Sequence, residues 1–381
     1  MNVLRICSVP LALLGYKTFF KELGAKDDVN LSIATSNDEL FQKLTSKDHY
    51  NVCELEIKRE INIFADIASI LNAVKLLLRL KPSIVHSNTP KGGLISAISS
   101  YLCRTPVRIH TFTGQRWVTL KGVKRFLLIW ADKLIIKLNT HLLADSKSQA
   151  DFLNKHFKTN KVICLGEGSF GGIDLEKFSP SIERTLMIRD SLGYQDDDFV
   201  ILYLGRVTKD KGIHELISSF VDLNKKYPNL KLLLVGPYEK KLDPLDENVE
   251  AVMLSHPHIK TIDFTDEPEK YFSACDVFCL PSYREGFGTV IIEAAAMSKA
   301  SIGSDIYGIS DAIIDNETGW LVKPRSVVEL REKIRYTYLN RQELKQTGER
   351  ALARARNSFD SGRVCDDLVE FYRRCLNEKG L

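Results

Sequence analysis

The chain has 381 residues, of which 44% are hydrophobic, and this length predicts two domains of ordinary size because it exceeds what one core usually supports. No apolar run reaches about 18 residues, which argues against a transmembrane span. The net charge of +4 is unevenly distributed: residues 1–180 carry 25 Lys and Arg against 16 Asp and Glu, and the remainder carries 28 against 33. A basic first half predicts an anionic partner, whether phospholipid, a lipid-linked phosphate or nucleic acid.

Short β-rich runs alternate with helical patterns along the first half of the chain. This rhythm is typical of a parallel sheet with helices on both faces. The predicted strands are Asn2–Ser8, Asn30–Thr35, Ser83–Ser87, Val107–Phe112 and His141–Asp145.

A second series of strands follows, so the sequence predicts a second sheet of the same kind. Its strands are expected at Phe199–Leu204, Leu230–Val235, Ile259–Phe264, Asp276–Leu280 and Ala300–Gly303. Little strand character lies between 175 and 198, and the chain is strongly helical after about residue 326. We therefore expect an N-terminal domain over 1–180, a C-terminal domain over 181–358, and a helix over 359–381 that crosses back to the first domain.

Ligands of open α/β sheets bind beyond the carboxyl ends of the strands, which directs attention to the loops there. In the first domain, the strand Val107–Phe112 carries His110 and continues into Thr113 and Gly114, and His110 is a candidate hydrogen-bonding residue or a core residue. In the second domain, Gly205–Gly212 holds Arg206 and Lys211 on either side of a short turn. Two such cations are suited to a diphosphate and to a departing nucleoside diphosphate.

The most informative segment is Pro281–Met297, which reads as a strand end, a loop and an Ala-rich helix. Gly286 and Gly288 bracket Phe287, so the backbone there can approach a ligand closely, and the start of the helix offers free N–H groups to phosphate. Two carboxylates, Glu285 and Glu293, suit the hydroxyl groups of a sugar or ribose. This segment predicts a nucleotide-sugar site.

Two motif matches point elsewhere. Gly166–Gly171 fits G-x-G-x-x-G literally, which raises a dinucleotide-dependent oxidoreductase as an alternative, but Pro180 leaves no room for the long helix that the signature needs. Asp196–Asp198 contains the Asp-x-Asp pattern that metal-dependent sugar transferases use. In those enzymes the pattern ends a strand, whereas here it precedes one, so we expect a solvated turn. Eight scattered cysteines form no metal-ligand pattern and fit buried thiols in a reducing cytoplasm.

Together these residues make the chain resemble family 4 of the retaining glycosyltransferases. The resemblance covers nearly the whole chain and is densest over 199–324. Glu285 and Glu293 match the family's Glu-x7-Glu pattern, and Gly205–Gly212 matches its diphosphate-binding turn. Gly168–Phe178 resembles the family's crossover between domains, which accounts for the literal dinucleotide motif. The implied fold is α/β of the GT-B type, with two doubly wound Rossmann-like domains facing an interdomain cleft.

The resemblance also implies roles for residues of the second domain. The first Glu of the family lies near the donor sugar and the second binds the ribose, which assigns Glu285 as catalytic and Glu293 as donor-binding. The backbone after the first Glu contacts the donor, and the diphosphate-binding turn contributes two cations. The residues that these roles add are Arg206 and Lys211 as catalytic residues, and Gly205, Gly286, Phe287, Gly288 and Thr289 as donor-binding residues.

The first domain departs from the family at two places. Many relatives have His-Gly where this chain has Thr113 and Gly114, so that role falls to Thr113 or His110, or is absent. Many also have a Gly pair after the first strand, where this chain retains only Gly15. We therefore keep His110 as a catalytic candidate and Thr113 and Gly15 as donor-binding candidates.

The activity implied is transfer of a hexose or N-acetylhexosamine, with retention, from a nucleotide diphosphate sugar such as a UDP-sugar to a lipid-linked glycan acceptor in surface polysaccharide assembly. No metal, no further cofactor and no nucleic-acid partner are implied, and a cytoplasmic location is expected. The basic, apolar stretch Lys121–Lys137 is open to two interpretations, contact with an anionic membrane surface or a buried helix with basic ends. A catalytically silent module of the same fold is a third alternative for the whole chain.

Overall fold

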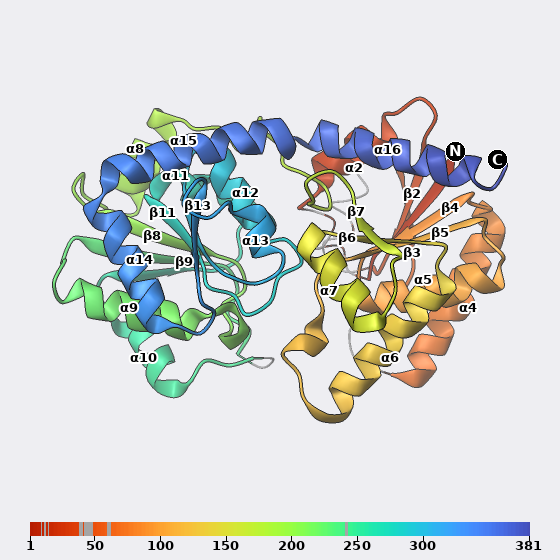
Figure 1. Ribbon diagram of the computed structural model, residues 1–381, viewed down its shortest axis with the longest axis horizontal. Coiled ribbons are helices and arrows are strands. Elements are labelled where there is room, and N and C mark those ends of the chain that lie inside the picture. Colours follow the sequence, from red (N-terminus) through yellow and green to blue (C-terminus); the bar gives the residue numbers. More distant parts are fainter. Residues whose placement is uncertain are drawn as a thin grey trace. The chain divides into compact units, whose positions relative to one another are not determined.

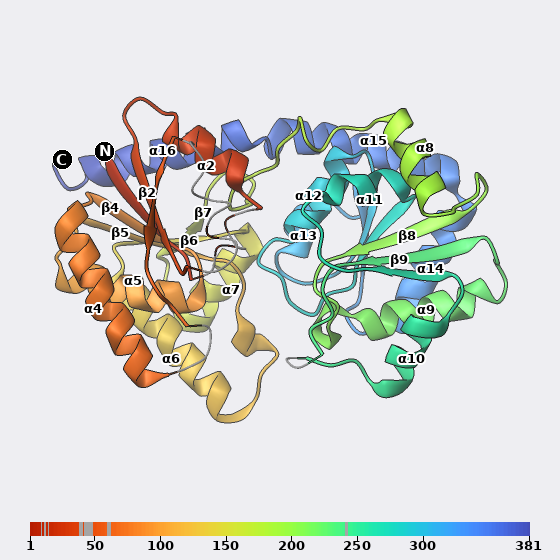
Figure 2. The ribbon, with the colours of Figure 1, turned by 180° about the vertical axis from the view of Figure 1, so that it is seen from behind.

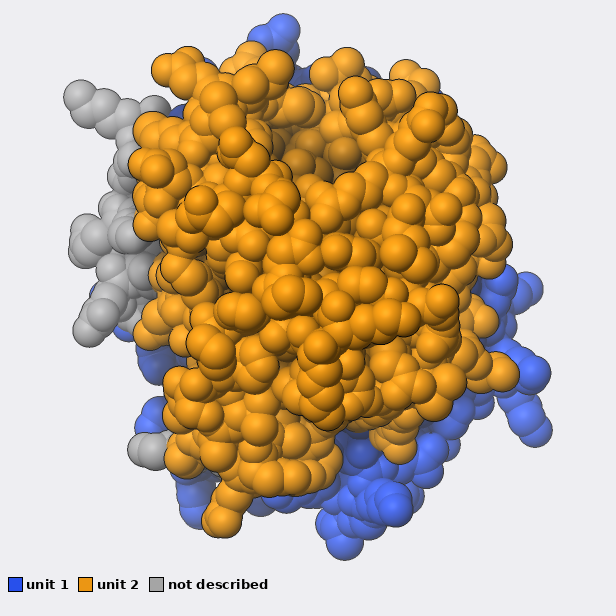
Figure 3. Space-filling view, turned by 90° about the vertical axis from the view of Figure 1, so that its left-hand side faces the viewer, with its two compact units in different colours: residues 1–174, 360–381 blue, residues 175–359 orange. Residues whose placement is uncertain are grey.

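The computed structural model describes residues 1–8, 10, 13, 15–37, 41, 49–58, 62–240 and 243–381. Its chain divides into two compact units (Figure 1, Figure 3). Unit 1 comprises residues 1–174 and 360–381, and unit 2 comprises residues 175–359.

Unit 1 is built on a parallel sheet with strand order β3-β2-β1-β4-β5-β6-β7. The chain starts in the middle of the sheet, builds outward to β3, and then crosses back to β4 on the other side of β1. The strands are β1 (Asn2–Ile6), β2 (Asn30–Thr35), β3 (Asn51–Glu54), β4 (Ile84–Ser87), β5 (Val107–Phe112), β6 (His141–Ala144) and β7 (Val162–Cys164).

Helices cover both faces of this sheet (Figure 1, Figure 2). Alternate residues of β1 point to opposite faces, so that Val3 packs in the core under α2 (Lys17–Gly24) and α16 (Ser361–Asn377), whereas Leu4 packs in the core on the other face. That second face is covered by α4 (Ile63–Leu80), α5 (Pro90–Leu102), α6 (Gly122–Leu138) and α7 (Lys147–Phe157), with a short 3-10 turn, η1 (Arg116–Val118), before α6.

The last helix, α16, is held to unit 1 by buried polar contacts as well as by apolar packing. The hydroxyl of Tyr372 lies 3.0 Å from Arg5 Nη1 and 2.7 Å from His86 Nδ1, and all three side chains are buried. Arg5 also lies over the Phe170 ring, 4.8 Å from its centroid. A residue near the C-terminus therefore completes a polar cluster that begins in the first strand.

Unit 2 has a second parallel sheet, ordered β10-β9-β8-β11-β12-β13. Its strands are β8 (Phe199–Leu204), β9 (Leu230–Val235), β10 (Ile259–Ile262), β11 (Val277–Leu280), β12 (Ser301–Ser304) and β13 (Gly319–Val322). The helices are α8 (Ile182–Ser191), α9 (Ile213–Asn224), α10 (Glu247–Ser255), α11 (Pro268–Ala274), α12 (Thr289–Ala296), α13 (Ile309–Ala312), α14 (Val327–Leu339) and α15 (Arg341–Ser358), with a 3-10 turn, η2 (Lys209–Lys211), before α9.

The predicted fold class, two Rossmann-like parallel sheets with helices on both faces, is confirmed. Each predicted strand is present within one to two residues of its expected ends. The two predicted series omitted β3, β7 and β13, which are strands of three or four residues at sheet edges. The interpretation of Gly166–Gly171 is confirmed, because no helix follows Gly171 before α8 begins at Ile182. The solvated turn expected at Asp196–Asp198 is correct only in part: Asp196 and Asp197 lie exposed in a turn, whereas Asp198 is 4% exposed and pairs with Lys231 Nζ at 3.3 Å.

Candidate active site

The sheet of unit 2 changes direction between β8 and β11. The chain passes from β8 outward through β9 to β10, and then returns to β11 on the opposite side of β8. At such a switch point the loops after two adjacent strands leave in opposite directions, which opens a crevice at the carboxyl edge of the sheet. The two loops here are 205–212 and 281–288, which hold most of the predicted donor-site residues.

The central contact of this edge is an ion pair between Lys211 Nζ and Glu285 Oε1. Lys211 comes from the turn η2 and Glu285 from the loop before α12. Both side chains are largely buried, with 13% and 16% of their surface exposed, so water screens the pair only in part. The structure thus brings together two residues that are 74 positions apart in the chain.

Three further contacts hold the two loops together. Gly212 has φ of 73°, and a Cβ at this position would lie 2.1 Å from the carbonyl oxygen of Pro281, so only glycine fits. The backbone N–H of Tyr283 donates to the carbonyl of Asp210 at 2.9 Å. The carboxylate of Asp210 pairs with Arg284 Nη2 at 2.6 Å, next to the Lys211–Glu285 pair.

Asp210 is held as a carboxylate by its surroundings. Burial acts to raise its pKa, but Arg284, the hydrogen bond from Thr208 and the charge of Lys211 outweigh burial and lower the pKa below the usual value. Asp210 therefore stays charged at neutral pH. Its role in the site is to link the two loops, not to exchange protons.

Arg206 lies at the entrance of the same loop. Its guanidinium pairs with Glu239 Oε2 at 2.7 Å, and its backbone carbonyl accepts a hydrogen bond of 2.6 Å from the buried Tyr203 hydroxyl. The side chain is 41% exposed, which is more than Lys211. Gly205 precedes it with φ of 146°, and a Cβ there would lie 3.1 Å from the Tyr203 hydroxyl.

The segment from Gly286 to Thr289 turns the chain into α12. Gly288 caps the helix with φ of 84°, and Thr289 is its first residue. Phe287 is buried and packs edge-on against Phe359, so its ring anchors the loop while the backbone stays at the sheet edge. The carbonyl of Gly286 lies so close to Gly308 that a Cβ on Gly308 would be 2.6 Å from it.

Glu293 lies one turn inside α12. Burial raises the pKa of its carboxyl to about 7, and the nearby charge of Lys177 acts in the opposite direction. Near neutral pH the carboxyl therefore exchanges between its charged and neutral forms, which sets it apart from an ordinary surface glutamate.

The candidates in unit 1 do not gather as those in unit 2 do. His110 is 2% exposed on β5, where its Nδ1 lies 2.9 Å from Ser87 Oγ and its ring packs against Gly93; burial lowers its pKa to about 3. Thr113 follows the same strand and donates from Oγ1 to the carbonyl of Asn88 at 3.0 Å. Gly15 is exposed with open space around it, and residues 9, 11, 12 and 14 of its loop lie outside the described part of the chain.

Sequence reasoning missed four polar residues of the unit 2 edge: Asp210, Glu239, Tyr283 and Arg284. A signal was available, because Asp210 and Arg284 adjoin predicted site residues and Glu239 follows the carboxyl end of β9. Tyr283 donates to Glu215 Oε1 at 2.6 Å and lies under the guanidinium of Arg325, 4.5 Å from the ring centroid.

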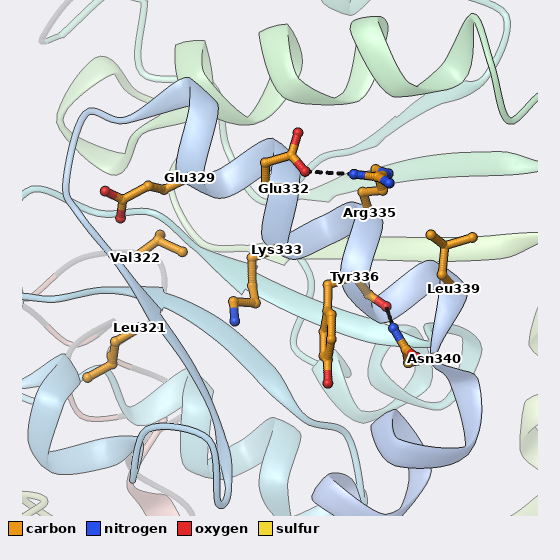
Figure 4. Close-up of a pocket in the computed structure, with 9 residues that line it drawn as sticks. All are labelled: Leu321, Val322, Glu329, Glu332, Lys333, Arg335, Tyr336, Leu339 and Asn340. Carbon is orange, nitrogen blue, oxygen red and sulfur yellow. Dashed lines mark hydrogen bonds and ion pairs between the residues drawn. The ribbon is translucent and has the colours of Figure 1, made fainter.

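A separate hollow of about 530 Å³ lies in unit 2 beside α14 and the edge strand β13 (Figure 4). Its charged groups are partly paired with one another, as Glu332 and Arg335 are at 2.9 Å. None of the predicted site residues lines it. The lining residues are Leu321, Val322, Glu329, Glu332, Lys333, Arg335, Tyr336, Leu339 and Asn340.

Two kinds of feature, a metal-ligand cluster and a membrane-spanning helix, are absent from the described residues. Among them, no group of three or more His, Cys, Asp or Glu side chains is arranged to hold a metal ion. No helix in the described ranges is long and apolar enough to cross a membrane.

Residues 186–354 match the family model described as "Glycosyl transferases group 1", and this range includes both loops of the unit 2 edge. The chain is 33% identical over 356 residues to the capsular polysaccharide biosynthesis glycosyltransferase CapM of Staphylococcus aureus, covering 93% of this chain and 92% of that protein. It is 26% identical over 364 residues, and 92% of each chain, to the N,N'-diacetylbacillosaminyl-diphospho-undecaprenol alpha-1,3-N-acetylgalactosaminyltransferase of Campylobacter jejuni. The crystal structure of Anabaena HepE in complex with UDP-glucose shares the fold, with a TM-score of 0.82 at 19% identity over 98% of this chain and 100% of that one.

Proposed function

Because the chain belongs to the group 1 glycosyl transferases, as a glycosyltransferase of bacterial polysaccharide biosynthesis, we propose that it moves a hexose or N-acetylhexosamine from a UDP-sugar to a lipid-linked glycan acceptor. The name of the Campylobacter relative includes a diphospho-undecaprenol acceptor, and HepE was crystallised with UDP-glucose. These two names support the proposed acceptor and donor classes. The oxidoreductase alternative is not favoured, because Gly166–Gly171 lacks the helix that a dinucleotide fold needs.

The observation that carries the proposal is the cluster of Arg206, Lys211 and Glu285 at the switch point of unit 2, next to the start of α12. We assign Arg206 and Lys211 to the donor diphosphate, assisted by the backbone of Gly205. Gly286 to Thr289 then present backbone groups to the donor, Glu285 faces the sugar hydroxyls and Glu293 accepts from the ribose.

The proposed reaction retains the anomeric configuration. The bond from the anomeric carbon to the diphosphate oxygen breaks, and the acceptor oxygen forms its bond on the same face. The acceptor proton passes to the leaving phosphate oxygen, so the protein supplies no proton. Lys211 and Arg206 stabilise the negative charge that develops on the leaving group, which is electrostatic catalysis by pre-positioned cations. The proposed reaction uses no metal and no cofactor beyond the donor.

The acceptor is assigned to unit 1. Thr113, kept above as a donor-binding candidate, and Asn88 follow β5 and β4 at the carboxyl edge of that sheet, where loops of α/β proteins bind ligands. We assign both to the acceptor side of the proposed site. His110 lies three residues before Thr113, on β5, and its burial favours a structural role. A nucleotide-sugar donor and eight free cysteines fit a cytoplasmic location.

A thermal-shift screen with UDP, GDP, ADP and their hexose and N-acetylhexosamine derivatives tests the donor, because a ligand that binds only the folded state raises the melting temperature. We expect UDP and one UDP-sugar to give the largest shift, and reduced nicotinamide nucleotide to give none. Retention is tested on the product formed from the matching UDP-sugar and a lipid diphosphate acceptor. NMR of the anomeric proton of this product shows whether the transferred sugar keeps the anomeric configuration of the donor. Stabilisation by UDP-sugar without transfer to any acceptor would instead support the silent module.

A further inference from the structure

Three neighbouring helices of unit 1 expose large apolar side chains to solvent. The helix α5 packs between α4 and α6, so the three form one layer on the sheet (Figure 1, Figure 2). About half of the exposed large apolar side chains in the described chain lie on them. We call their outer surface the α4–α5–α6 face; its apolar members are Ile63, Phe64, Ile67, Leu71, Leu78, Tyr101, Leu102, Val123, Phe126, Leu127 and Trp130.

The spacing of these residues gives each outer helix a continuous apolar stripe. On α4 the exposed residues Ile63, Ile67 and Leu71 are four apart, and on α6 Val123, Phe126 and Trp130 are three and four apart. Phe64 is 87% exposed and Val123 is 73% exposed, so these side chains are not core residues at the edge of a helix. Exposed apolar surface of this extent marks an interaction site in a folded protein.

The charges on these helices and on the segments between them are almost all positive. Residues 62–138 contain twelve Lys and Arg but only two acidic residues, Asp66 and Asp132. Asp66 pairs with Lys91 at 2.6 Å, and Asp132 is buried and accepts from the Trp117 indole at 2.7 Å. Neither carboxylate therefore offsets the exposed cations, which include Lys75, Arg79, Lys81, Lys121, Lys124, Arg125, Lys133 and Lys137.

We propose that the α4–α5–α6 face docks on an anionic phospholipid surface. Phe, Trp and Leu side chains flanked by Lys and Arg on a helix are the composition that lies in the bilayer interface, with the rings in the acyl boundary and the cations at the phosphates. A second copy of this chain is a poor occupant, because the face would meet its own positive charge without acidic partners. Because the face carries an excess of positive charge, it should bind an anionic bilayer more strongly than a neutral one.

Docking through this face also sets how unit 1 is oriented on the membrane, and thereby where the acceptor would bind. This part of the inference rests on the proposed function. A helix that connects parallel strands runs opposite to them, so the N-terminal ends of α4 and α6 lie at the carboxyl edge of the unit 1 sheet. Ile63, Phe64, Val123 and Phe126 lie at those ends. Docking through them brings the carboxyl edge, with Thr113 and Asn88, close to the bilayer in which a lipid-linked acceptor resides.

Flotation of the full chain with vesicles tests the surface. We expect the protein to rise with equimolar phosphatidylglycerol and phosphatidylcholine vesicles, to stay at the bottom with phosphatidylcholine alone, and to be released by salt. The double variant Phe64→Glu with Trp130→Glu is expected to lower the partition coefficient by about tenfold or more, since each removes a large apolar side chain from the interface. The control Leu254→Glu, an exposed apolar residue on α10 of unit 2, should leave flotation unchanged.

Circular dichroism and the UDP-induced thermal shift verify that each variant is folded. Transfer to a water-soluble acceptor should persist in the double variant, which separates the loss of docking from a failure of the proposed activity. Equal flotation of wild type with and without anionic lipid would overturn the proposal. So would a dimer of the wild type in solution that the double variant converts to a monomer, because the face would then be covered by a second copy.

Discussion

Lys211 and Glu285 neutralise each other at the centre of the unit 2 edge. A diphosphate that binds Lys211 therefore shares the ammonium with Glu285, and the carboxylate in turn becomes available to a sugar hydroxyl. In the proposed site the pair would couple recognition of the leaving group to recognition of the sugar, which a single cation on an open surface would not do.

The first prediction at the residue scale concerns Lys211. Lys211→Ala should lower the turnover number by about 100-fold to 1,000-fold, because it removes a cation aimed at the developing charge of the leaving diphosphate. The matched control is Lys209→Ala, two residues earlier in the same turn, where the ammonium pairs with the exposed Asp246. Initial rates with UDP-sugar give the turnover numbers of both variants. Equal rates for the two variants would contradict the proposed role of Lys211 in stabilising the leaving diphosphate.

A second prediction follows from the pKa of Glu293, which burial raises from an ordinary value of 4.5 to about 7. Between these values the folded protein binds more protons than the unfolded chain, so the contribution of Glu293 to stability falls as the pH rises through this window. Glu293→Gln stays neutral, and its unfolding free energy relative to wild type should increase between about pH 5 and pH 8 and then level off.

Denaturant unfolding at a series of pH values measures this difference, with the exposed Glu349→Gln as the control. A difference that is flat for Glu293→Gln across the window would show that its carboxyl has an ordinary pKa. The same variant should bind UDP more weakly if Glu293 receives a ribose hydroxyl, which isothermal titration would detect.

At the scale of elements, the site depends on how closely two loops approach. Gly212 and Pro281 are in contact through the backbone, and Asp210 and Arg284 join the same loops through their side chains. The strands beneath, β8 and β11, are neighbours in the sheet although 72 residues separate the end of one from the start of the other. The site is therefore a product of the sheet topology, and the loops fix its detail.

Gly212→Ala should destabilise unit 2 by about 2 kcal/mol or more, because a Cβ would meet the Pro281 carbonyl and the residue would remain at positive φ. Gly193→Ala is the matched control: its φ is 67°, but the nearest atom to its Cβ is 3.8 Å away, so it reports the conformational strain alone, about 1 kcal/mol. Thermal and denaturant unfolding give both values. Equal destabilisation would mean that the loops relax around the new methyl group.

A double-mutant cycle tests the link between Asp210 and Arg284. We expect Asp210→Asn and Arg284→Gln each to reduce kcat/KM, and the double variant to lose less than the sum, with a coupling of about 1–3 kcal/mol. The exposed pair Glu332 and Arg335 serves as the control, where the coupling should be below about 0.5 kcal/mol. Additive effects at 210 and 284 would mean that the two residues act separately.

The sequence predicted these elements better than the contacts between them. The strands that end at Leu204 and Leu280 carry long apolar runs, which periodicity detects well, whereas β3 and β13 are short and lie at sheet edges, where such a signal is weak. The candidates Arg206, Lys211, Glu285 and Glu293 were predicted because they follow strand ends in a recognisable motif. The pairing of Asp210 with Arg284 was not, because it depends on which strands become neighbours in space.

At the scale of the whole molecule, unit 1 is assembled from two distant pieces of chain. Residues 360–381 return to pack α16 beside α2, and the core they join includes Phe19, Phe20 and Leu23. Tyr372 adds its hydroxyl to the buried Arg5 and His86. Unit 2 is thus inserted, in sequence, into unit 1.

Tyr372→Phe should lower the unfolding free energy by about 1–3 kcal/mol, because it leaves a buried guanidinium group without one of its partners. Tyr101→Phe, in the same unit, removes a hydroxyl from a ring that is 54% exposed and should change stability by less than about 0.5 kcal/mol. The dissociation constant for UDP should be the same in both, since the residues that we assign to the donor diphosphate and ribose lie in unit 2. Denaturant unfolding and calorimetric titration provide the two measurements.

The return of α16 reverses the usual relation between the order of synthesis and the order of folding. As the chain leaves the ribosome, residues 1–174 emerge first, yet their core lacks Tyr372 and its neighbours until residues 360–381 have emerged. Unit 2, residues 175–359, is complete before unit 1, because all of its strands and helices have emerged when residue 360 is added. A ribosome that stalls before residue 360 would therefore hold a complete unit 2 and an incomplete unit 1, and a nascent chain of that length should depend on chaperones for its first half.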